Sequence, residues 1–223
     1  MTNPEPNTNS TRPIWTQIGI IFLVLVIAAA ALFFTFNALK PYAFHGAILQ
    51  SPQPAQDFTL INQYGQETSL SDYTGKVVLL YFGYIACPDV CPTSLSVLGQ
   101  VENQLKQQDP RLAERFKVRL VSVDPDADTL ERLGQYVGAF SSSFLGVRGE
   151  RADLVKFTDQ VNVAFAKVPL RSPVPGSDAQ GYTVDHTGNI VIINPRGHYH
   201  GFIKLPHKAE TIRLSYQTLD AQF

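Results

Sequence analysis

Hydrophobic positions divide the chain into an apolar N-terminal stretch and a longer region of short alternating runs. Residues 18–36 read IGIIFLVLVIAAAALFFTF, without a charged side chain. This run approaches the roughly 20 residues that a helix needs to cross a bilayer. A cleaved secretory signal has a shorter apolar region and small residues at its exit. We therefore expect an uncleaved transmembrane anchor at residues 18–37, after a disordered tail at residues 1–17 that is rich in Asn, Thr and Pro.

The segment that follows the anchor has no clear hydrophobic period. Residues 38–56 carry few charges and include Pro52 and Pro54. This composition predicts a semi-extended linker that holds a folded domain away from the bilayer. The remaining length, residues 57–223, suits one ordinary domain with a sizeable core.

Within residues 57–223, short β-branched or aromatic runs alternate with amphipathic stretches. The clearest buried strands are KVVLLYFGY at residues 76–84 and FKVRLVSV at residues 116–123. Further strands are expected at residues 163–168, 182–187 and 189–194, the last two meeting at Gly188 as a hairpin. The apolar positions with helical spacing are Leu95, Leu98, Val101 and Leu105; Leu130, Leu133, Val137 and Phe140; Leu154, Phe157 and Val161; and Ile212, Tyr216, Leu219 and Phe223. This order predicts an α/β domain built around a central sheet.

Two local features complete the expected organisation of the domain. Asp128, with Glu131 three residues later, resembles a capping box at the start of the second helix. Residues 171–180, RSPVPGSDAQ, have the composition of a surface loop.

Charge and cysteine content narrow the classes of function. The chain has 18 Lys and Arg against 19 Asp and Glu, mixed along its length, so no basic patch is expected and nucleic acid is not an expected partner. Positive charges on the two sides of the anchor do not decide its orientation. The chain has 2 cysteines, which is too few for a disulfide-stapled mini-domain or a multi-cysteine zinc module.

The two cysteines lie close together, in GYIACPDVCPT at residues 83–93. This segment joins a predicted strand to a predicted helix, and Pro92 suits the first helical turn. A helix N-terminus favours thiolate over thiol, which makes sulfur both a nucleophile and a metal ligand. Cys87 and Cys91 can therefore close a disulfide or hold a soft metal ion. A purely structural disulfide is the weaker explanation, because so short a loop stabilises least. A pair that acts only in redox exchange remains the rival.

Three motifs in the domain resemble one known family. They are YFGY at residues 81–84 with CPDVCP at 87–92, SVDP at 122–125 with Asp128-Thr129, and VDHT at 184–187. The sequence is similar, from about Phe58 to the C-terminal helix, to the Sco/SenC family of copper-binding proteins that help assemble cytochrome c oxidase. The resemblance implies a thioredoxin-like α/β fold, with a central mixed sheet flanked by helices, after one N-terminal transmembrane helix.

The resemblance also implies a copper site formed by Cys87, Cys91 and His186. Two thiolates and one imidazole suit Cu(I), and a weak fourth ligand would allow Cu(II). Asp185 either orients the imidazole or forms the turn near Gly188.

A second pair of histidines lies outside these motifs. His198 and His200 alternate, so on a strand they would face the same way and could bind Cu(II) at the surface. The family does not require such a site, and an exposed strand edge is the simpler expectation.

Two functions follow from the resemblance. The first is a metallochaperone that takes copper from a donor protein and passes it to the binuclear copper centre of cytochrome c oxidase subunit II. The alternative is a thiol-disulfide reductase, restored by a thiol reductant, that keeps the cysteines of that centre reduced. A thiol peroxidase does not fit, because neither cysteine follows the Pro-x-x-x-Thr/Ser-x-x-Cys pattern. The N-terminus has no convincing mitochondrial transit signal, so we expect a bacterial inner membrane protein. The resemblance implies that its C-terminal domain faces the periplasm or the equivalent extracytoplasmic space.

Overall fold

A computed structural model describes residues 13–38, 44–56, 58–170 and 181–223. The chain divides into two compact units, Met1–Ala43 and Phe44–Phe223. The first contains one helix and the second contains the sheet, and each is treated by itself.

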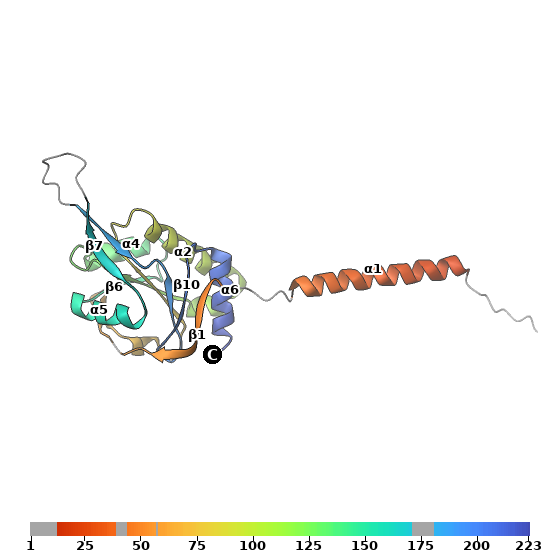
Figure 1. The fold of residues 1–223 in the computed structure, drawn as a ribbon, viewed down its shortest axis with the longest axis horizontal. Helices are drawn as coiled ribbons and strands as arrows, with labels where there is room; N and C mark the ends of the chain where they lie inside the picture. Colours follow the sequence, from red (N-terminus) through yellow and green to blue (C-terminus); the bar gives the residue numbers. More distant parts are fainter. Residues whose placement is uncertain (1–12, 39–43, 57, 171–180) are drawn as a thin grey trace, which may run out of the picture. The chain divides into compact units, whose positions relative to one another are not determined.

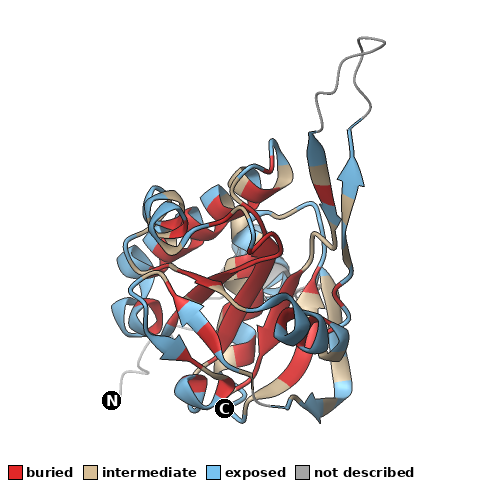
Figure 2. Ribbon diagram, turned by 90° about the vertical axis from the view of Figure 1, so that its left-hand side faces the viewer, coloured by how far each residue is buried: buried red, intermediate tan, exposed pale blue. Residues whose placement is uncertain are grey.

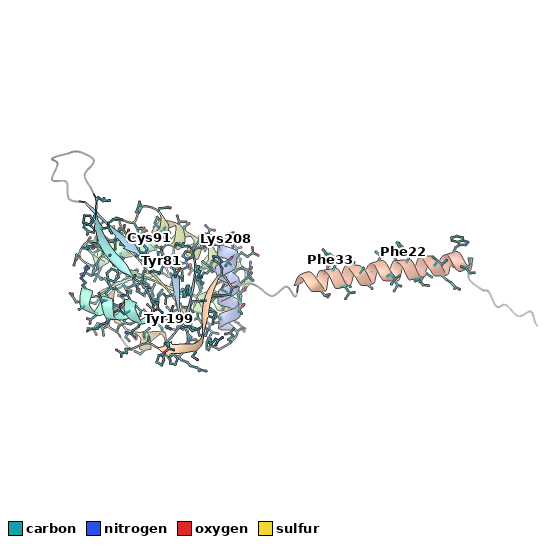
Figure 3. All side chains as sticks on the ribbon, viewed as in Figure 1. Phe22, Phe33, Tyr81, Cys91, Tyr199 and Lys208 are labelled. Atoms are coloured by element: carbon teal, nitrogen blue, oxygen red, sulfur yellow. The ribbon has the colours of Figure 1, made fainter. Side chains whose placement is uncertain are left out.

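The first unit contains α1 (Ile14–Ala38). Its segment Ile14–Thr35 is long and apolar enough to cross a membrane, and none of it is buried within the structure. Phe22 and Phe33 project outward from the helix (Figure 3). The helix begins earlier than the sequence pattern predicted, so the expected disordered tail at residues 1–17 is wrong for its last four residues; residues 1–12 lie outside the described part of the chain.

The second unit is built on an eight-stranded mixed sheet, in the order β1-β10-β9-β4-β5-β6-β2-β3. Strands β4, β5 and β6 run parallel, whereas β9 and β10 join antiparallel. The strands are β1 (Gly46–Pro54), β2 (Leu60–Asn62), β3 (Glu67–Thr68), β4 (Val78–Gly83), β5 (Lys117–Ser122), β6 (Leu145–Arg148), β9 (Ile190–Ile193) and β10 (His198–Ile203). A separate two-stranded sheet pairs β7 (Phe165–Pro169) with β8 (Tyr182–His186).

Helices flank the central sheet, as predicted for an α/β domain (Figure 1). They are α2 (Val90–Gln108), α3 (Pro110–Arg115), α4 (Leu130–Gly138), α5 (Arg151–Gln160) and α6 (Ala209–Asp220), with a 3-10 helix η1 at Leu70–Tyr73. Helix α2 packs against α3 and α6, and α4 packs on β6.

The core follows the continuous apolar runs. Every residue of β4 and of β9 is buried, because both strands lie inside the sheet and are covered on both faces. The centre of the domain is buried while the outward faces of its helices are exposed (Figure 2). This buried centre holds the end of β4, and with it the start of the cysteine segment, in a fixed place.

The predicted linker at residues 38–56 is wrong for most of its length. Residues 46–54 form β1, an edge strand paired with β10 from Gly46↔Ile203 to Pro54↔His198. Prolines are tolerated in an edge strand, because one side of the strand makes no ladder hydrogen bonds. The strand is only half-buried and its register shifts after Ile48, so its sequence lacks an alternating pattern. The domain therefore starts before residue 57.

The predicted hairpin at Gly188 is also wrong. Strand β8 pairs with β7, whereas β9 lies between β10 and β4 in the main sheet. Residues 187–189 therefore connect two different sheets. The strand expected at residues 163–168 is confirmed as β7, and the loop predicted at residues 171–180 lies outside the described residues.

Candidate metal centre

The two cysteines lie between a buried strand and a helix, as predicted. Strand β4 ends at Gly83 and α2 begins at Val90, so Cys91 sits in the first helical turn. Cys91 is 0% exposed and Cys87 is 8% exposed. The backbone N–H of Cys91 donates to Cys87 Sγ at 3.4 Å. The N-terminal end of α2 therefore supplies a donor to one sulfur and places the other in the protein interior.

Gly83 makes room for the buried sulfur. A Cβ atom at this position would lie 2.8 Å from Cys91 Sγ and 3.2 Å from Tyr81 Cε1. Real Cβ contacts are longer, so a larger residue requires the sulfur to move. The sequence analysis included Gly83 only as part of a motif. A glycine at the end of a buried strand often marks a place where another group approaches closely, and this signal could have indicated its role.

His186 is the last residue of β8, and its imidazole faces the buried cysteine. Its Nε2 lies 3.4 Å from Cys91 Sγ. Its Nδ1 lies 3.2 Å from the carbonyl oxygen of Thr187, which can only accept a hydrogen bond. The hydrogen of the neutral ring is therefore on Nδ1, and the lone pair of Nε2 points toward the sulfur. Asp185 is exposed, so the ring's orienting contact is the Thr187 carbonyl.

The donor atoms of Cys87, Cys91 and His186 all lie within 4.8 Å of one another. Donor atoms held about 2.0–2.3 Å from one metal ion lie about 3.5–4 Å apart in a trigonal arrangement. Closing the cluster onto an ion thus requires shifts of less than about 1 Å, so the arrangement fits a metal. Among the residues that the structure describes, no other group of three such side chains is close enough to hold an ion.

Burial controls the protonation of the cluster. It raises the pKa of the Cys91 thiol, and the nearby Cys87 raises it further. Burial also lowers the pKa of His186, opposed by the Thr187 carbonyl and Asp185. The expectation that the helix end favours a thiolate is therefore outweighed at Cys91 by desolvation. The site without a metal holds a neutral thiol and a neutral imidazole, and binding must release the thiol proton.

Aromatic rings surround the imidazole. The ring centroids of Tyr81 and Tyr84 lie 6.2 Å and 6.0 Å from that of His186, both nearly perpendicular to it. Tyr81 and Cys91 are both 0% exposed. Burial raises the pKa of Tyr81, which therefore stays neutral. These edge-on rings flank His186 and limit the movement of its imidazole.

A pocket of about 260 Å³ opens beside the cluster. It is lined by Tyr84, Cys87, Pro88, Asp89, Val90, Thr183, Val184, Asp185 and His186. Cys91 is not among the lining residues. An incoming group therefore reaches Cys87 and His186 from the surface, while Cys91 holds its position behind them.

Comparison with known proteins decides the family. Residues 47–219 match the family model described as SCO1/SenC. The chain belongs to the SCO1/SenC family. The SCO2-like protein of Rickettsia prowazekii is 30% identical to it over 184 residues, which are 81% of this chain and 85% of that protein. The bovine mitochondrial Protein SCO2 homolog is 31% identical over 177 residues, 79% of this chain and 64% of that protein, so the chain spans about two thirds of this relative.

Solved structures of the SCO1/SenC family share the fold. The apo Sco1 protein of Thermus thermophilus matches with a TM-score of 0.67 at 34% identity, covering 81% of this chain and 99% of that one. ScoI of Bradyrhizobium japonicum with copper bound matches with a TM-score of 0.63 at 28% identity, covering 74% and 98%. The predicted family and its thioredoxin-like α/β fold are confirmed.

Two aspartates of the SCO1/SenC domain have roles that the sequence did not reveal. The predicted cap Asp128 is wrong: Thr129 caps α4 and accepts from the Arg132 N–H at 3.3 Å. The buried Asp128 instead accepts from Ser122 Oγ at 2.7 Å and from the Ile85 N–H at 3.3 Å, which fastens the cysteine segment to the end of β5. Burial raises the pKa of Asp128. Asp124 is buried beneath the β7–β8 sheet.

The histidine pair His198 and His200 lies elsewhere in the domain. Strand β10 is an interior strand between β1 and β9, so the predicted exposed edge is wrong. His200 is 6% exposed, and its Nδ1 lies 3.4 Å from the Asn194 amide nitrogen. Neither histidine belongs to a three-residue metal cluster within the described ranges.

Proposed function

We propose that this SCO1/SenC protein binds one copper ion through Cys87, Cys91 and His186 and delivers it to the binuclear copper centre of cytochrome c oxidase subunit II. The observation that carries the proposal is the convergence of two sulfurs and one imidazole nitrogen within 4.8 Å. Soft sulfur ligands select Cu(I), and imidazole suits copper in either oxidation state. A relative of the same family, ScoI of Bradyrhizobium japonicum, is solved with copper bound, which supports copper as the ion.

The pocket suggests how copper leaves. Cys87 and His186 line the pocket, whereas Cys91 lies behind it. A thiolate of the acceptor protein entering from the surface replaces His186 or Cys87 first, and the bond to Cys91 breaks last. Each exchange replaces one copper bond by another, so copper passes between proteins without being released into water. The open pocket leaves room for the weak fourth ligand that Cu(II) would take.

Helix α1 provides the membrane anchor in this proposal. Its apolar segment Ile14–Thr35 reaches the length needed to cross a bilayer. The oxidase copper centre lies on the outer side of a bacterial inner membrane, and we place the domain of residues 44–223 in the periplasm on that ground. A single anchor of this kind keeps the copper site close to the membrane-bound acceptor.

A second function, thiol-disulfide reduction, is supported by the unequal burial of the cysteines. Both are free thiols, and Cys87 lines the pocket while Cys91 is fully buried. In such a reaction the Cys87 thiolate attacks the acceptor disulfide, forms a mixed disulfide and releases one acceptor thiolate. Cys91 then attacks Cys87, so the acceptor leaves as a dithiol and Cys87–Cys91 becomes a disulfide. Two electrons pass to the acceptor, and a thiol reductant restores the pair.

Competition for Cu(I) tests the proposed site. The full chain in detergent micelles is titrated against a Cu(I) chelator, with His186→Ala compared with His198→Ala as a matched histidine control. Loss of a residue that only orients a metal ligand typically weakens metal binding roughly tenfold. We expect His186→Ala to weaken Cu(I) binding by more than this, because it removes a ligand, and His198→Ala to bind Cu(I) like the unaltered chain. Equal affinities for all three proteins would refute the site.

Transfer experiments separate the two functions. The Cu(I)-loaded chain is mixed with the metal-free soluble copper domain of oxidase subunit II, whose cysteines are either reduced or oxidised. If the protein is a chaperone, the loaded chain transfers copper to the reduced acceptor. If it is a reductase, the copper-free chain with reduced cysteines reduces the oxidised acceptor. Retention of copper by the loaded chain in the presence of the reduced acceptor would contradict delivery.

A further inference from the structure

Strands β7 and β8, which we call the β7–β8 arm, project from the rest of the domain (Figure 2). The arm carries His186 at its inner end, but it belongs to no large sheet. Val168 and Tyr182 are 37% and 41% exposed, so little apolar contact holds its outer part. The position of His186 therefore depends on the few contacts that fasten the arm to the domain.

One face of the arm carries these contacts. Tyr182, Val184 and His186 alternate along β8 and so point to the same side. Lys167 lies opposite Val184 in the strand register, which puts its side chain on that side as well. Tyr182 and His186 are about 13 Å apart along an extended strand.

Polar groups from the middle and the outer end of this face converge on Asp124, a residue of the loop after β5. Lys167 Nζ pairs with Asp124 Oδ1 at 2.8 Å and with Asp126 Oδ2 at 3.0 Å. The Tyr182 hydroxyl donates to Asp124 Oδ2 at 2.7 Å. We call Asp124, Asp126, Lys167 and Tyr182 the Asp124 cluster.

The carboxylate at the centre of the Asp124 cluster is shielded from water, whereas its lysine partner is partly exposed. The Asp124 side chain is 3% exposed and that of Lys167 is 29% exposed. Lys167 Nζ also lies 4.6 Å from the centre of the Tyr182 ring. A buried carboxylate has to keep its partners, because an unpaired charge in the interior is strongly unfavourable. These contacts therefore hold the arm more firmly than an exposed ion pair would.

A second contact holds the middle of the arm. The Tyr84 hydroxyl lies 2.9 Å from Thr183 Oγ1 and accepts from the Val184 N–H at 3.3 Å. With Tyr84 as the pivot, loss of the Asp124 cluster lets the arm tilt. His186 lies two strand residues, or about 7 Å, beyond Val184 at this pivot, so a tilt of about 10° moves the imidazole by about 1 Å. Since His186 Nε2 is 3.4 Å from Cys91 Sγ, such a shift changes whether nitrogen and sulfur reach the same ion.

We propose that the Asp124 cluster positions His186 for metal binding, with Tyr182, four residues along β8 from His186, and Lys167, opposite Val184, as positioning residues. This inference rests on the proposed function, because it assigns the histidine to the ion. Its consequence is specific: the cluster contributes to copper affinity through His186 and not through the two sulfurs. A merely structural cluster would affect folding without that dependence.

A double-mutant cycle on the full chain in detergent tests this inference, with Cu(I) in chelator competition as the probe. Lys167→Met removes the ion pairs and keeps the length of the side chain. Lys156→Met is the matched control, because Lys156 forms a comparable ion pair with Asp153 on the exposed surface of α5. Tyr182→Phe removes only the hydroxyl group. It replaces Lys167→Met in the cycle if thermal unfolding shows that Lys167→Met folds poorly.

We expect Lys167→Met to weaken Cu(I) binding roughly tenfold, in line with the loss of contacts that orient a ligand, and Lys156→Met to leave it unchanged. In a His186→Ala background the effect of Lys167→Met should fall below about twofold, because the ligand it positions is gone. Equal losses in both backgrounds, or no loss in either, would overturn the inference. An unchanged affinity of His186→Ala alone would instead refute the proposed copper site.

Discussion

Gly83→Ala tests how closely the buried sulfur packs against the end of β4. The new Cβ would lie 2.8 Å from Cys91 Sγ, against about 3.5–4.0 Å for a relaxed contact, so the sulfur must retreat by about 0.7 Å or more. Cys91 is 0% exposed, so its sulfur has to retreat within the packed interior of the domain. Overpacking of this kind destabilises by about 1–3 kcal/mol, partly offset by about 0.4–1 kcal/mol because alanine restricts the unfolded chain. We expect a net loss of about 1–2 kcal/mol in the free energy of unfolding and weaker copper binding.

The matched control is Gly138→Ala, at the exposed end of α4. An added Cβ there meets no atom within 4 Å, and neither glycine has a positive φ. Both variants are measured by urea unfolding and by Cu(I) competition with the full chain in detergent. Gly138→Ala should be neutral or slightly stabilising and should bind copper normally. If Gly83→Ala matches this control in both assays, the close packing of Cys91 Sγ against Gly83 is wrong.

Two further predictions concern oxidation and pH. Joining Cys87 to Cys91 as a disulfide should abolish stoichiometric copper uptake, because the disulfide consumes both thiolates. Metal analysis of the oxidised chain after gel filtration tests this prediction, and one bound copper per chain would contradict it. Burial lowers the pKa of His207 from 6.5 to about 4, so its contribution to stability is present above pH 6.5 and is lost as the pH falls toward 4. Urea unfolding across this range should show a weaker pH dependence for His207→Gln than for the unaltered chain, and parallel curves would exclude His207 as a source of it.

The parts of the fold that the sequence predicts are those with strong local signals. Strands β4 and β5 are nearly continuous apolar runs, and α2 has a regular apolar face, so the hydrophobic pattern of the sequence identifies all three. Strand β1 escaped prediction because it is a half-buried edge strand with two prolines, and its pairing with β10 joins segments about 150 residues apart. Pairing between distant segments has no local signature, which also explains the wrong hairpin at Gly188.

The residues of the proposed metal site were named from the sequence, but the groups that support them were not. The spacing of Cys87 and Cys91 marks them as candidate metal ligands, whereas His186 was assigned only through the family resemblance. The contact of Gly83 with the Cys91 sulfur and the attachment of Lys167 to Asp124 depend on side chains from different elements meeting in space. Asp128 was misassigned for the same reason: its sequence position suits a helix cap, but its hydrogen bonds go to Ser122 and Ile85.

X-ray absorption spectroscopy of the Cu(I)-loaded full chain tests the central claim most directly, because it counts the atoms bound to copper. The account predicts two sulfur ligands and one imidazole nitrogen for the unaltered chain, and loss of the nitrogen in His186→Ala with both sulfurs retained. A spectrum with sulfur ligands alone in the unaltered chain, or one whose imidazole contribution persists in His186→Ala, would contradict it.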